Sequence, residues 1–369
     1  MTETTSQSET THAADHFDAK RRQILKLSAA SLAAYGAASF LPSSNAKAKT
    51  MTQDWDKTFP KSDLVDHEKI TFTNRFGITL SGDLYIPKTR SDKATSAIAI
   101  SGPFGAVKEQ SSGLYAQTLA EKGFVTLAFD PSFTGESGGQ PRNTASPDIN
   151  TEDFSAAVDY LGQHPSVDRE KIGILGICGW GGLALNAAAI DKRVNAVATS
   201  TMYDMSRLMS HGYYDSNTPE QRSQTLDQLA AQRWKDVDNG APMYGPKSLE
   251  LTGGEPQFVI EYAAYYKAMN RGFHPRAINS NASFSLTTAL SFMNAPLMSH
   301  IAEIAPRPTL LIHGEDAHSL YFSQTAYDAA AEPKELLIVP GANHTDLYDQ
   351  MDKIPFDKLS DFFGQHLAG

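Results

Sequence analysis

The chain has a single cysteine, Cys178, which lies in the stretch GILGICGWGG at residues 173–182. A short apolar run that breaks into glycines is typical of a strand that turns sharply into a helix. The spacing resembles the Gly-x-Ser-x-Gly turn that presents a catalytic serine, with Cys178 at the nucleophile position and Trp180 where the second glycine would stand. A thiol at a helix N-terminus can ionise near neutral pH when a neighbouring base accepts its proton. Cys178 is therefore predicted to be a nucleophile that forms a thioester with an acyl substrate; the alternative is a small buried core residue.

A general base for this thiol is predicted at His344. It lies in the stretch GANHTD, at the end of the apolar run KELLIVPG. A carboxylate that fixes the imidazole tautomer would complete a triad, and the stretch HGEDAHS offers two after another apolar run. Glu315 leads over Asp316 by a small margin because its side chain is longer, and Asp204 is a further candidate.

Backbone amides that stabilise an oxyanion are predicted on either side of the thiol. The stretch GPFGAVKEQ at 102–110 follows a further apolar run. Its proline has no N–H, so Phe104 or Gly105 is the expected donor there. The amide of Gly179, the residue after the nucleophile, is the second expected donor.

Three further side chains are candidates for the surroundings of the site. Trp180 is expected to contact the substrate, the alternative being the neighbouring strand. His318 is a candidate for substrate contact or for the surface. His313 is expected to be a strand histidine that packs under the site.

Strands and helices alternate along most of the chain. Extended segments at 69–73 and 78–86 are expected to form an antiparallel pair. Later apolar runs are nearly continuous, which is typical of strands covered on both faces. The expected strands are 96–102, 123–130, 171–178, 194–200, 309–315 and 334–341, and the expected helices are 108–122, 151–163 with Asn150 as its N-cap, 179–190, 321–332 and 356–367. This pattern predicts an α/β fold with a doubly wound, mostly parallel sheet, whose strand ends carry the candidate site.

One long interval breaks the alternation. It separates the strands expected at 194–200 and 309–315 and contains clusters of aromatic residues and methionines. A connection of this length needs structure of its own, so 203–303 is expected to form a mostly helical cap over the strand ends. The sheet-bearing core would then consist of 49–202 and 304–369.

The first 48 residues are typical of a cleavable export signal. A basic stretch, KRRQILK, precedes a short apolar segment, and small residues follow up to Ala46-Lys47-Ala48. The pair Arg21-Arg22 resembles a twin-arginine signal, which predicts export through the twin-arginine machinery to the periplasm or outside the cell. No stable membrane span is expected in the mature protein. The alternative is an amphipathic or membrane-anchoring start.

Composition excludes several classes of protein. The net charge of −10 and the isoelectric point near 5.5 argue against binding of nucleic acid or anionic membranes through a general basic field. One cysteine provides neither an intramolecular disulfide nor a CxxC pair, and there is no HExxH motif. We therefore expect no metal and no cofactor; the expected partner is a small acyl substrate.

The order of nucleophile, acid and histidine gives the chain a family resemblance. With the GIC turn, the late GANH histidine and the stretch DPSFTGESGG at 130–139, it resembles the dienelactone-hydrolase-like branch of the α/β-hydrolase superfamily. The resemblance covers roughly residues 60–369 outside most of the cap, and the family's usual acid position falls on Ala317. It implies a Cys-His-acid triad in place of Ser-His-Asp.

These observations together predict an exported hydrolase that cleaves an ester, lactone or thioester through Cys178. Two alternatives remain open. The same fold and thiol would serve an acyltransferase or a peptidase, or the protein would bind a ligand under the cap without catalysis.

Overall fold

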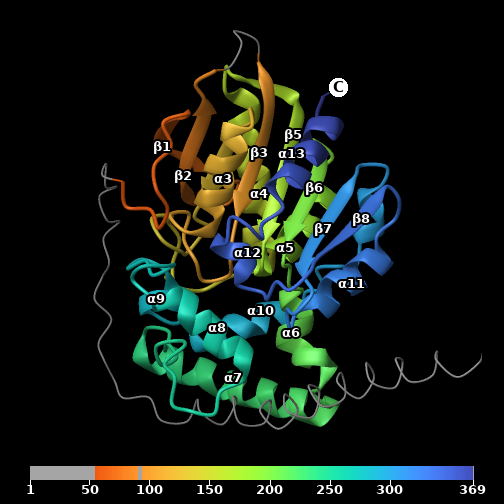
Figure 1. Cartoon of the computed structure of the whole chain (residues 1–369). Coiled ribbons are helices and arrows are strands. Elements are labelled where there is room, and N and C mark those ends of the chain that lie inside the picture. Colours follow the sequence, from red (N-terminus) through yellow and green to blue (C-terminus); the bar gives the residue numbers. More distant parts are fainter. Residues whose placement is uncertain (1–54, 90–93, 369) are drawn as a thin grey trace, which may run out of the picture.

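The computed structural model describes residues 55–89 and 94–368. The predicted export signal at 1–48 lies outside the described residues. Within the described part, one eight-stranded sheet runs through the molecule in the order β1-β2-β4-β3-β5-β6-β7-β8 (Figure 1). The strands are β1 Val65–Thr73, β2 Thr79–Pro87, β3 Thr95–Ser101, β4 Val125–Phe129, β5 Val167–Ile177, β6 Val194–Ser200, β7 Thr309–Gly314 and β8 Lys334–Val339.

Strand direction divides the sheet into two parts. β1 pairs antiparallel with β2, and β2 pairs antiparallel with β4. All pairs from β4 through β3 to β8 are parallel. β4 and β7 are mostly apolar and are buried along their whole length because helices cover both faces. The predicted doubly wound, mostly parallel α/β sheet is confirmed.

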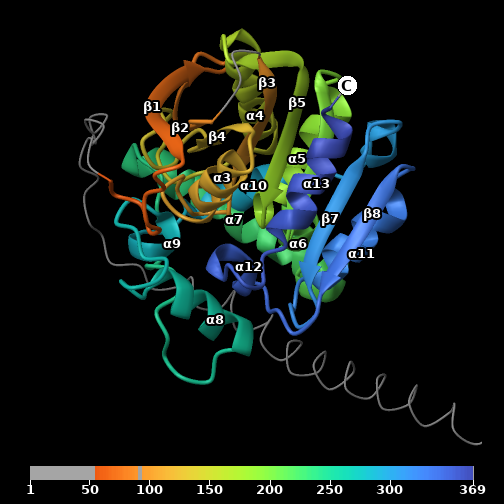
Figure 2. The same ribbon diagram turned by 45° about the horizontal axis from the view of Figure 1, so that its top comes forward.

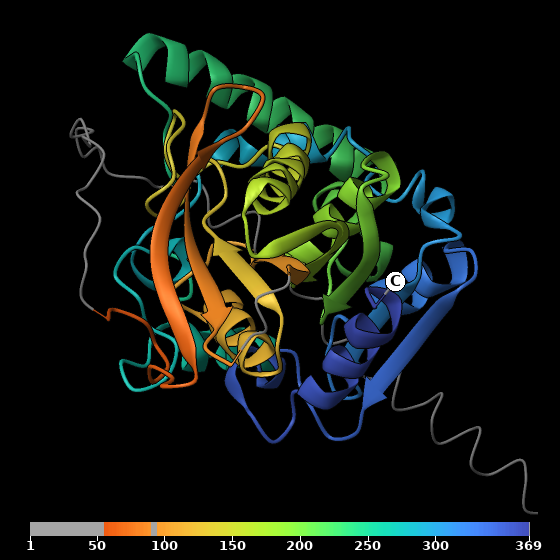
Figure 3. The same cartoon turned by 90° about the horizontal axis from the view of Figure 1, so that it is seen from above.

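Helices cover the two faces of this sheet (Figure 3). α4 Pro147–Gln163 and α5 Gly179–Ile190 lie together on one face, and α3 Ser111–Glu121 and α13 Phe356–His366 lie on the other. α11 Leu320–Ala329 packs on β7 and β8.

The expected N-cap of α4 was wrong. The helix begins at Pro147 after Ser146, a position where the missing proline N–H costs nothing. Asn150 instead lies buried inside the first turn, and its side-chain oxygen accepts a 2.8 Å hydrogen bond from the Ser146 N–H.

The interval between β6 and β7 forms a helical layer at the carboxyl ends of the strands (Figures 1 and 2). Its longest helix, α7, begins with a capping box between Thr218 and Gln221. The elements of this interval, which we call the cap, are α6 Met205–His211, η2 Tyr213–Asp215, α7 Pro219–Asn239, α8 Gln257–Tyr266, α9 Ile278–Asn281, η3 Leu286–Thr288, α10 Ala289–Phe292 and η4 Ile301–Ile304.

A short helix completes the strand-end region. α12 Asp346–Asp349 lies beside the strand ends on the side of α8 (Figure 2). Among the described helices, none is both long enough and apolar enough to cross a membrane.

Candidate active site

Cys178 occupies a strained turn between β5 and α5. Its backbone has φ 57° and ψ −128°, a conformation that residues with a Cβ rarely adopt. The Cys178 N–H donates a 3.0 Å hydrogen bond to the carbonyl oxygen of Ser200 at the end of β6, which holds the turn in place. Such strain persists only where the surrounding structure imposes it, and it is concentrated at functional sites.

Glycines beside the turn resolve the crowding that Trp180 would cause in a Gly-x-Ser-x-Gly arrangement. A Cβ on Gly176 would lie 2.2 Å from the Trp180 carbonyl oxygen, and a Cβ on Gly181 would lie 2.4 Å from the Cβ of Met202. The close contact of helix and strands therefore depends on these two glycines. The Trp180 side chain itself is buried in the core, with its ring 6.1 Å from that of Phe154. It does not line the cavity at Cys178, so the expected substrate contact is corrected to a packing role.

The two expected oxyanion donors lie next to each other at the thiol. A Cβ on Gly179 would be only 2.8 Å from the Cβ of Phe104. The backbone amides of both residues interact with the Cys178 thiol and act to lower its pKa. Asn279 of α9 fixes this loop from the cap, because its side-chain amide donates a 2.8 Å hydrogen bond to the Phe104 carbonyl oxygen. Its backbone N–H donates a 3.1 Å hydrogen bond to the carbonyl oxygen of Gly105.

A cavity of about 190 Å³ opens at the thiol, between the strand ends and the cap. Among the described residues that line it, none carries a charged side chain. Tyrosines dominate the polar lining, together with Asn279 and Ser248. The five tyrosines are Tyr203, Tyr213, Tyr262, Tyr266 and Tyr348.

His344 is fully buried and its imidazole is hydrogen-bonded on both sides. Nδ1 lies 2.8 Å from the Thr201 hydroxyl and 2.5 Å from the Ser319 hydroxyl. Nε2 lies 3.0 Å from the hydroxyl of Tyr348. Neutral hydroxyls therefore occupy the positions where a carboxylate and the nucleophile would bind in a Ser-His-Asp triad.

Burial keeps the site uncharged in its resting state. It lowers the pKa of His344 well below its usual value, and the neighbouring His318 and His313 lower that pKa further. Burial also raises the pKa of the Cys178 thiol, an effect that nearby amides and tyrosine hydroxyls oppose. At neutral pH the resting pair is therefore a thiol and a neutral imidazole rather than an ion pair.

The expected carboxylates do not reach His344. Glu315 and Asp316 are exposed on the turn after β7, and Glu315 accepts a 3.2 Å hydrogen bond from the Gly341 N–H. Asp204 is the N-cap of α6 and accepts hydrogen bonds from two amides of its first turn. The turn instead brings Ser319 to the imidazole, a residue that sequence reasoning missed because a lone serine in a loop carries no distinctive signal.

The other two candidate histidines lie near the site but outside the cavity lining. The ring of His318 stacks on Phe258 with centroids 4.2 Å apart and hydrogen-bonds the hydroxyl of Tyr203, which lines the cavity. His313 on β7 is fully buried, and its Nε2 lies 2.9 Å from the same Ser319 hydroxyl that contacts His344. Burial lowers the pKa of both His313 and His318 to about 3.

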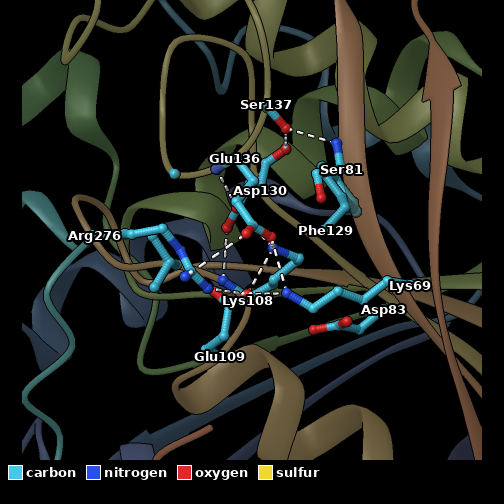
Figure 4. Close-up of polar contacts among 12 residues, drawn as sticks. Lys69, Ser81, Asp83, Lys108, Glu109, Phe129, Asp130, Glu136, Ser137 and Arg276 are labelled. Atoms are coloured by element: carbon cyan, nitrogen blue, oxygen red, sulfur yellow. Dashed lines mark hydrogen bonds and ion pairs between the residues drawn. The ribbon is translucent and has the colours of Figure 1, made fainter. Parts of the chain in front are cut away.

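A buried ion cluster holds the end of the loop at 102–110, which carries the expected oxyanion donor Phe104 (Figure 4). The Lys108 ammonium lies 2.7 Å from Glu109, 3.0 Å from Asp130 and 2.7 Å from Glu136. Burial alone would lower the pKa of Lys108, but these carboxylates raise it well above its usual value. Arg276 extends the cluster into the cap, with its guanidinium 2.7 Å from Glu109. We call these five residues the buried ion cluster.

Over residues 55–89 and 94–368, no group of three or more histidine, cysteine or carboxylate side chains is placed to hold a metal ion.

Sequence and structure comparisons relate the chain to several known proteins. Protein PA2218 of Pseudomonas aeruginosa is 67% identical over 317 residues, which cover 86% of this chain and 85% of that protein. Its crystal structure matches with a TM-score of 0.85 and covers 86% of this chain and 98% of that one. Polyketide transferase grgF of a Penicillium species is 28% identical, covering 84% of this chain and 98% of that protein. Thiohydrolase aneE of Aspergillus aculeatus is 26% identical, covering 75% and 86%.

A solved structure of the α/β-hydrolase GrgF has the same fold. It matches with a TM-score of 0.69 at 24% identity and covers 82% of this chain and all of that one. The sequence model of the X-Pro dipeptidyl-peptidase (S15) family matches residues 77–346, which is most of the chain. The predicted superfamily is confirmed, and the chain belongs to the X-Pro dipeptidyl-peptidase (S15) family of α/β-hydrolases.

Proposed function

We propose that the protein cleaves thioesters or esters of small uncharged acyl groups, with Cys178 as nucleophile and His344 as general base. The observation that carries this proposal is the strained Cys178 turn at the N-terminus of α5, where the amides of Phe104 and Gly179 converge on the thiol at the cavity. A nucleophile beside two amides is the arrangement that acyl transfer requires.

The reaction proceeds in two steps. The thiol of Cys178 loses its proton toward His344 and attacks the acyl carbonyl, and the amides of Phe104 and Gly179 stabilise the oxyanion that forms. The leaving group departs with the proton, and the acyl group remains on sulphur as a thioester. Water then attacks this thioester, with His344 again as the final proton acceptor, and the thiol is regenerated.

Transfer of the acyl group to an alcohol or thiol acceptor is the second candidate function. A relative described as a polyketide transferase supports it, whereas one described as a thiohydrolase supports hydrolysis. The chemistry differs only in whether water or the acceptor attacks the acyl-enzyme. The dienelactone-hydrolase-like branch stays a prediction.

A peptidase function fits the cavity less well. An X-Pro substrate brings a charged N-terminal amine, which a site accommodates at low cost only with a carboxylate partner. Within the described part of the chain, the cavity lining provides no such group. We therefore expect little release of nitroaniline from a dipeptidyl Xaa-Pro p-nitroanilide.

The test uses p-nitrophenyl acetate and an N-acetylcysteamine thioester as substrates. Replacing Cys178→Ala is expected to lower kcat by about 10³-fold or more, because the nucleophile is lost while the oxyanion donors remain. Cys178→Ser is expected to retain only slight activity, since a hydroxyl is much less acidic than a thiol. His344→Ala should cost about as much as Cys178→Ala, and the double variant little more.

Circular dichroism and thermal melts of each variant provide the control for folding. Near wild-type turnover by a folded Cys178→Ala variant would refute the proposal. Adding an alcohol or thiol acceptor separates the two candidates: acceleration with formation of the transfer product identifies a transferase, and constant hydrolysis identifies a hydrolase.

We also propose that the protein acts in the periplasm or outside the cell after twin-arginine export. The pair Arg21-Arg22 and the small residues before position 48 support this. Replacing both arginines by lysine is expected to retain the precursor in the cytoplasm. Intact-mass analysis of the periplasmic fraction checks it, and a periplasmic protein that still begins at Met1 would contradict it.

A further inference from the structure

The route from the thiol to its base passes through a third side chain. Cys178 and Tyr348 both line the cavity, whereas His344 does not and is fully buried. Nε2 of His344, the nitrogen that would accept the thiol proton, has the Tyr348 hydroxyl 3.0 Å away as its hydrogen-bond partner. The base is therefore separated from the cavity by the tyrosine.

The Tyr348 hydroxyl also interacts with the nucleophile. Its interaction with the Cys178 thiol opposes the rise in the thiol pKa that burial causes. The phenol thus interacts with the sulphur in the shared cavity lining and hydrogen-bonds the imidazole nitrogen. The thiol S–H can therefore donate to the phenol oxygen, and the phenol O–H can donate to Nε2 of His344.

Packing holds the tyrosine in this position. Tyr348 lies four residues after His344, on α12, and the two rings have centroids 5.4 Å apart. The ring of Tyr265 packs edge-on at 5.0 Å, and that of Tyr266 at 6.2 Å. Tyr348 is completely buried, so few rotamers are open to it.

We propose that Tyr348 relays the thiol proton of Cys178 to His344. The S–H bond breaks as its proton passes to the phenol oxygen, and the phenol O–H bond breaks as its own proton binds Nε2 of His344. Sulphur keeps the electron pair and attacks the acyl carbonyl. One proton has moved from sulphur to nitrogen, and the phenol ends as it began.

The relay is concerted, because a free phenolate is costly at this place. Burial raises the pKa of Tyr348 well above its usual value, so its hydroxyl stays protonated. When the tetrahedral intermediate collapses, His344 returns its proton to the phenol oxygen and the phenol gives its own proton to the departing group, which keeps the electron pair of the broken bond. This inference rests on the proposed function, since it assigns Tyr348 to the reaction that Cys178 carries out.

The experiment compares Tyr348→Phe with the matched control Tyr265→Phe. Both changes remove one phenol hydroxyl from equally buried, neighbouring rings, but Tyr265 lies outside the cavity lining and makes no hydrogen bond to His344. For Tyr348→Phe we expect a loss of about 10²-fold or more in kcat for p-nitrophenyl acetate, in line with removal of a proton-transfer group. For Tyr265→Phe we expect a change below about threefold.

Alkylation of Cys178 by iodoacetamide separates proton transfer from folding. At pH 7, Tyr348→Phe is expected to slow alkylation, because thiolate formation has lost its route to the base. At a pH high enough to ionise the thiol directly, wild type and variant should react at the same rate. A merely structural role would alter the rate at high pH as well.

Wild-type protein provides a measurement that needs no variant. In mixtures of H₂O and D₂O, a relay moves two protons in one step, so kcat/KM should depend on deuterium fraction along a curve rather than a straight line. A straight line, or a folded Tyr348→Phe variant with near wild-type kcat, would overturn the relay. If Cys178→Ala is inactive in the same preparation, the proposed nucleophile stands and only the relay fails.

Discussion

Replacing Ser319→Asp would give His344 the carboxylate that it lacks. The Ser319 hydroxyl lies 2.5 Å from Nδ1 of His344, so an aspartate there would have its charge about 4 Å from the protonated ring. At an effective dielectric constant of about 20, the attraction is about 4 kcal/mol, equivalent to about 3 units of imidazole pKa. Burying the carboxylate offsets part of this gain, so we expect the pKa of His344 to rise by about 1–2 units.

The acidic limb of the pH profile of kcat/KM measures this change. Wild type should keep its activity as the pH falls below 6, because burial holds the pKa of His344 low and the base stays unprotonated. Ser319→Asp should lose activity at a pH about 1–2 units higher, in proportion to the rise in that pKa. The same shift should appear in the pH dependence of iodoacetamide alkylation.

A matched control places the new carboxylate beside His313 instead of His344. The Ser323 hydroxyl lies 2.6 Å from Nδ1 of His313 and is not a partner of His344. Ser323→Asp should therefore shift the acidic limb by much less than Ser319→Asp. Coincident profiles for wild type and a folded, active Ser319→Asp variant would show that His344 is not the titrating base and would refute this reasoning.

Two further predictions concern the oxyanion donors and acid stability. Gly179→Ala should lower kcat by about 10²-fold with little change in KM, because its methyl group would lie 2.8 Å from the Cβ of Phe104 and displace a donor amide. Steady-state kinetics with p-nitrophenyl acetate measure this, and an unchanged kcat would contradict it. The pKa values of buried His313, His318 and His344 are lowered in the folded protein, so below about pH 6.5 the unfolded chain binds more protons than the folded chain. The free energy of unfolding should therefore fall as the pH drops below that value, by about 1.4 kcal/mol per pH unit for each histidine. Urea unfolding at pH 7 and pH 5 measures this, and His313→Gln, but not a change at exposed His211, should flatten the dependence.

The sequence predicted the sheet well because its strands are continuous apolar runs. The helix at 179–190 and the strand at 194–200 have the same bounds in the structure, since glycines mark the start of the first and small residues the end of the second. The start of α4 was missed at Asn150, because Pro147 at the first helical position was the stronger signal. The bounds of helices and strands can therefore be predicted from the residues at their ends.

The candidate site was less predictable, because its contacts join distant segments. Cys178 and the paired amides follow from the turn, since a strand-to-helix corner places a thiol at the helix N-terminus. The partner of His344 does not follow, because the turn after β7 directs Glu315 to solvent and Ser319 inward, and sequence gives no sign of that direction. Tyr348, four residues after His344, has the sequence features of an ordinary core aromatic. Its relation to Cys178 and His344 is visible only in the structure.

The buried ion cluster restricts how a substrate reaches the thiol. Arg276 belongs to the cap, while Lys108 and Glu109 belong to the core, so swinging the cap outward would separate buried opposite charges. Breaking a buried pair costs about 3–5 kcal/mol, which would leave an opened cap populated at about one molecule in 150 or fewer. We therefore expect entry and product release to depend on rotation of Tyr213 and Tyr262, the two cavity tyrosines that are only half-buried. Turnover would then be sensitive to the bulk of these rings, and smaller side chains there would admit larger acyl groups.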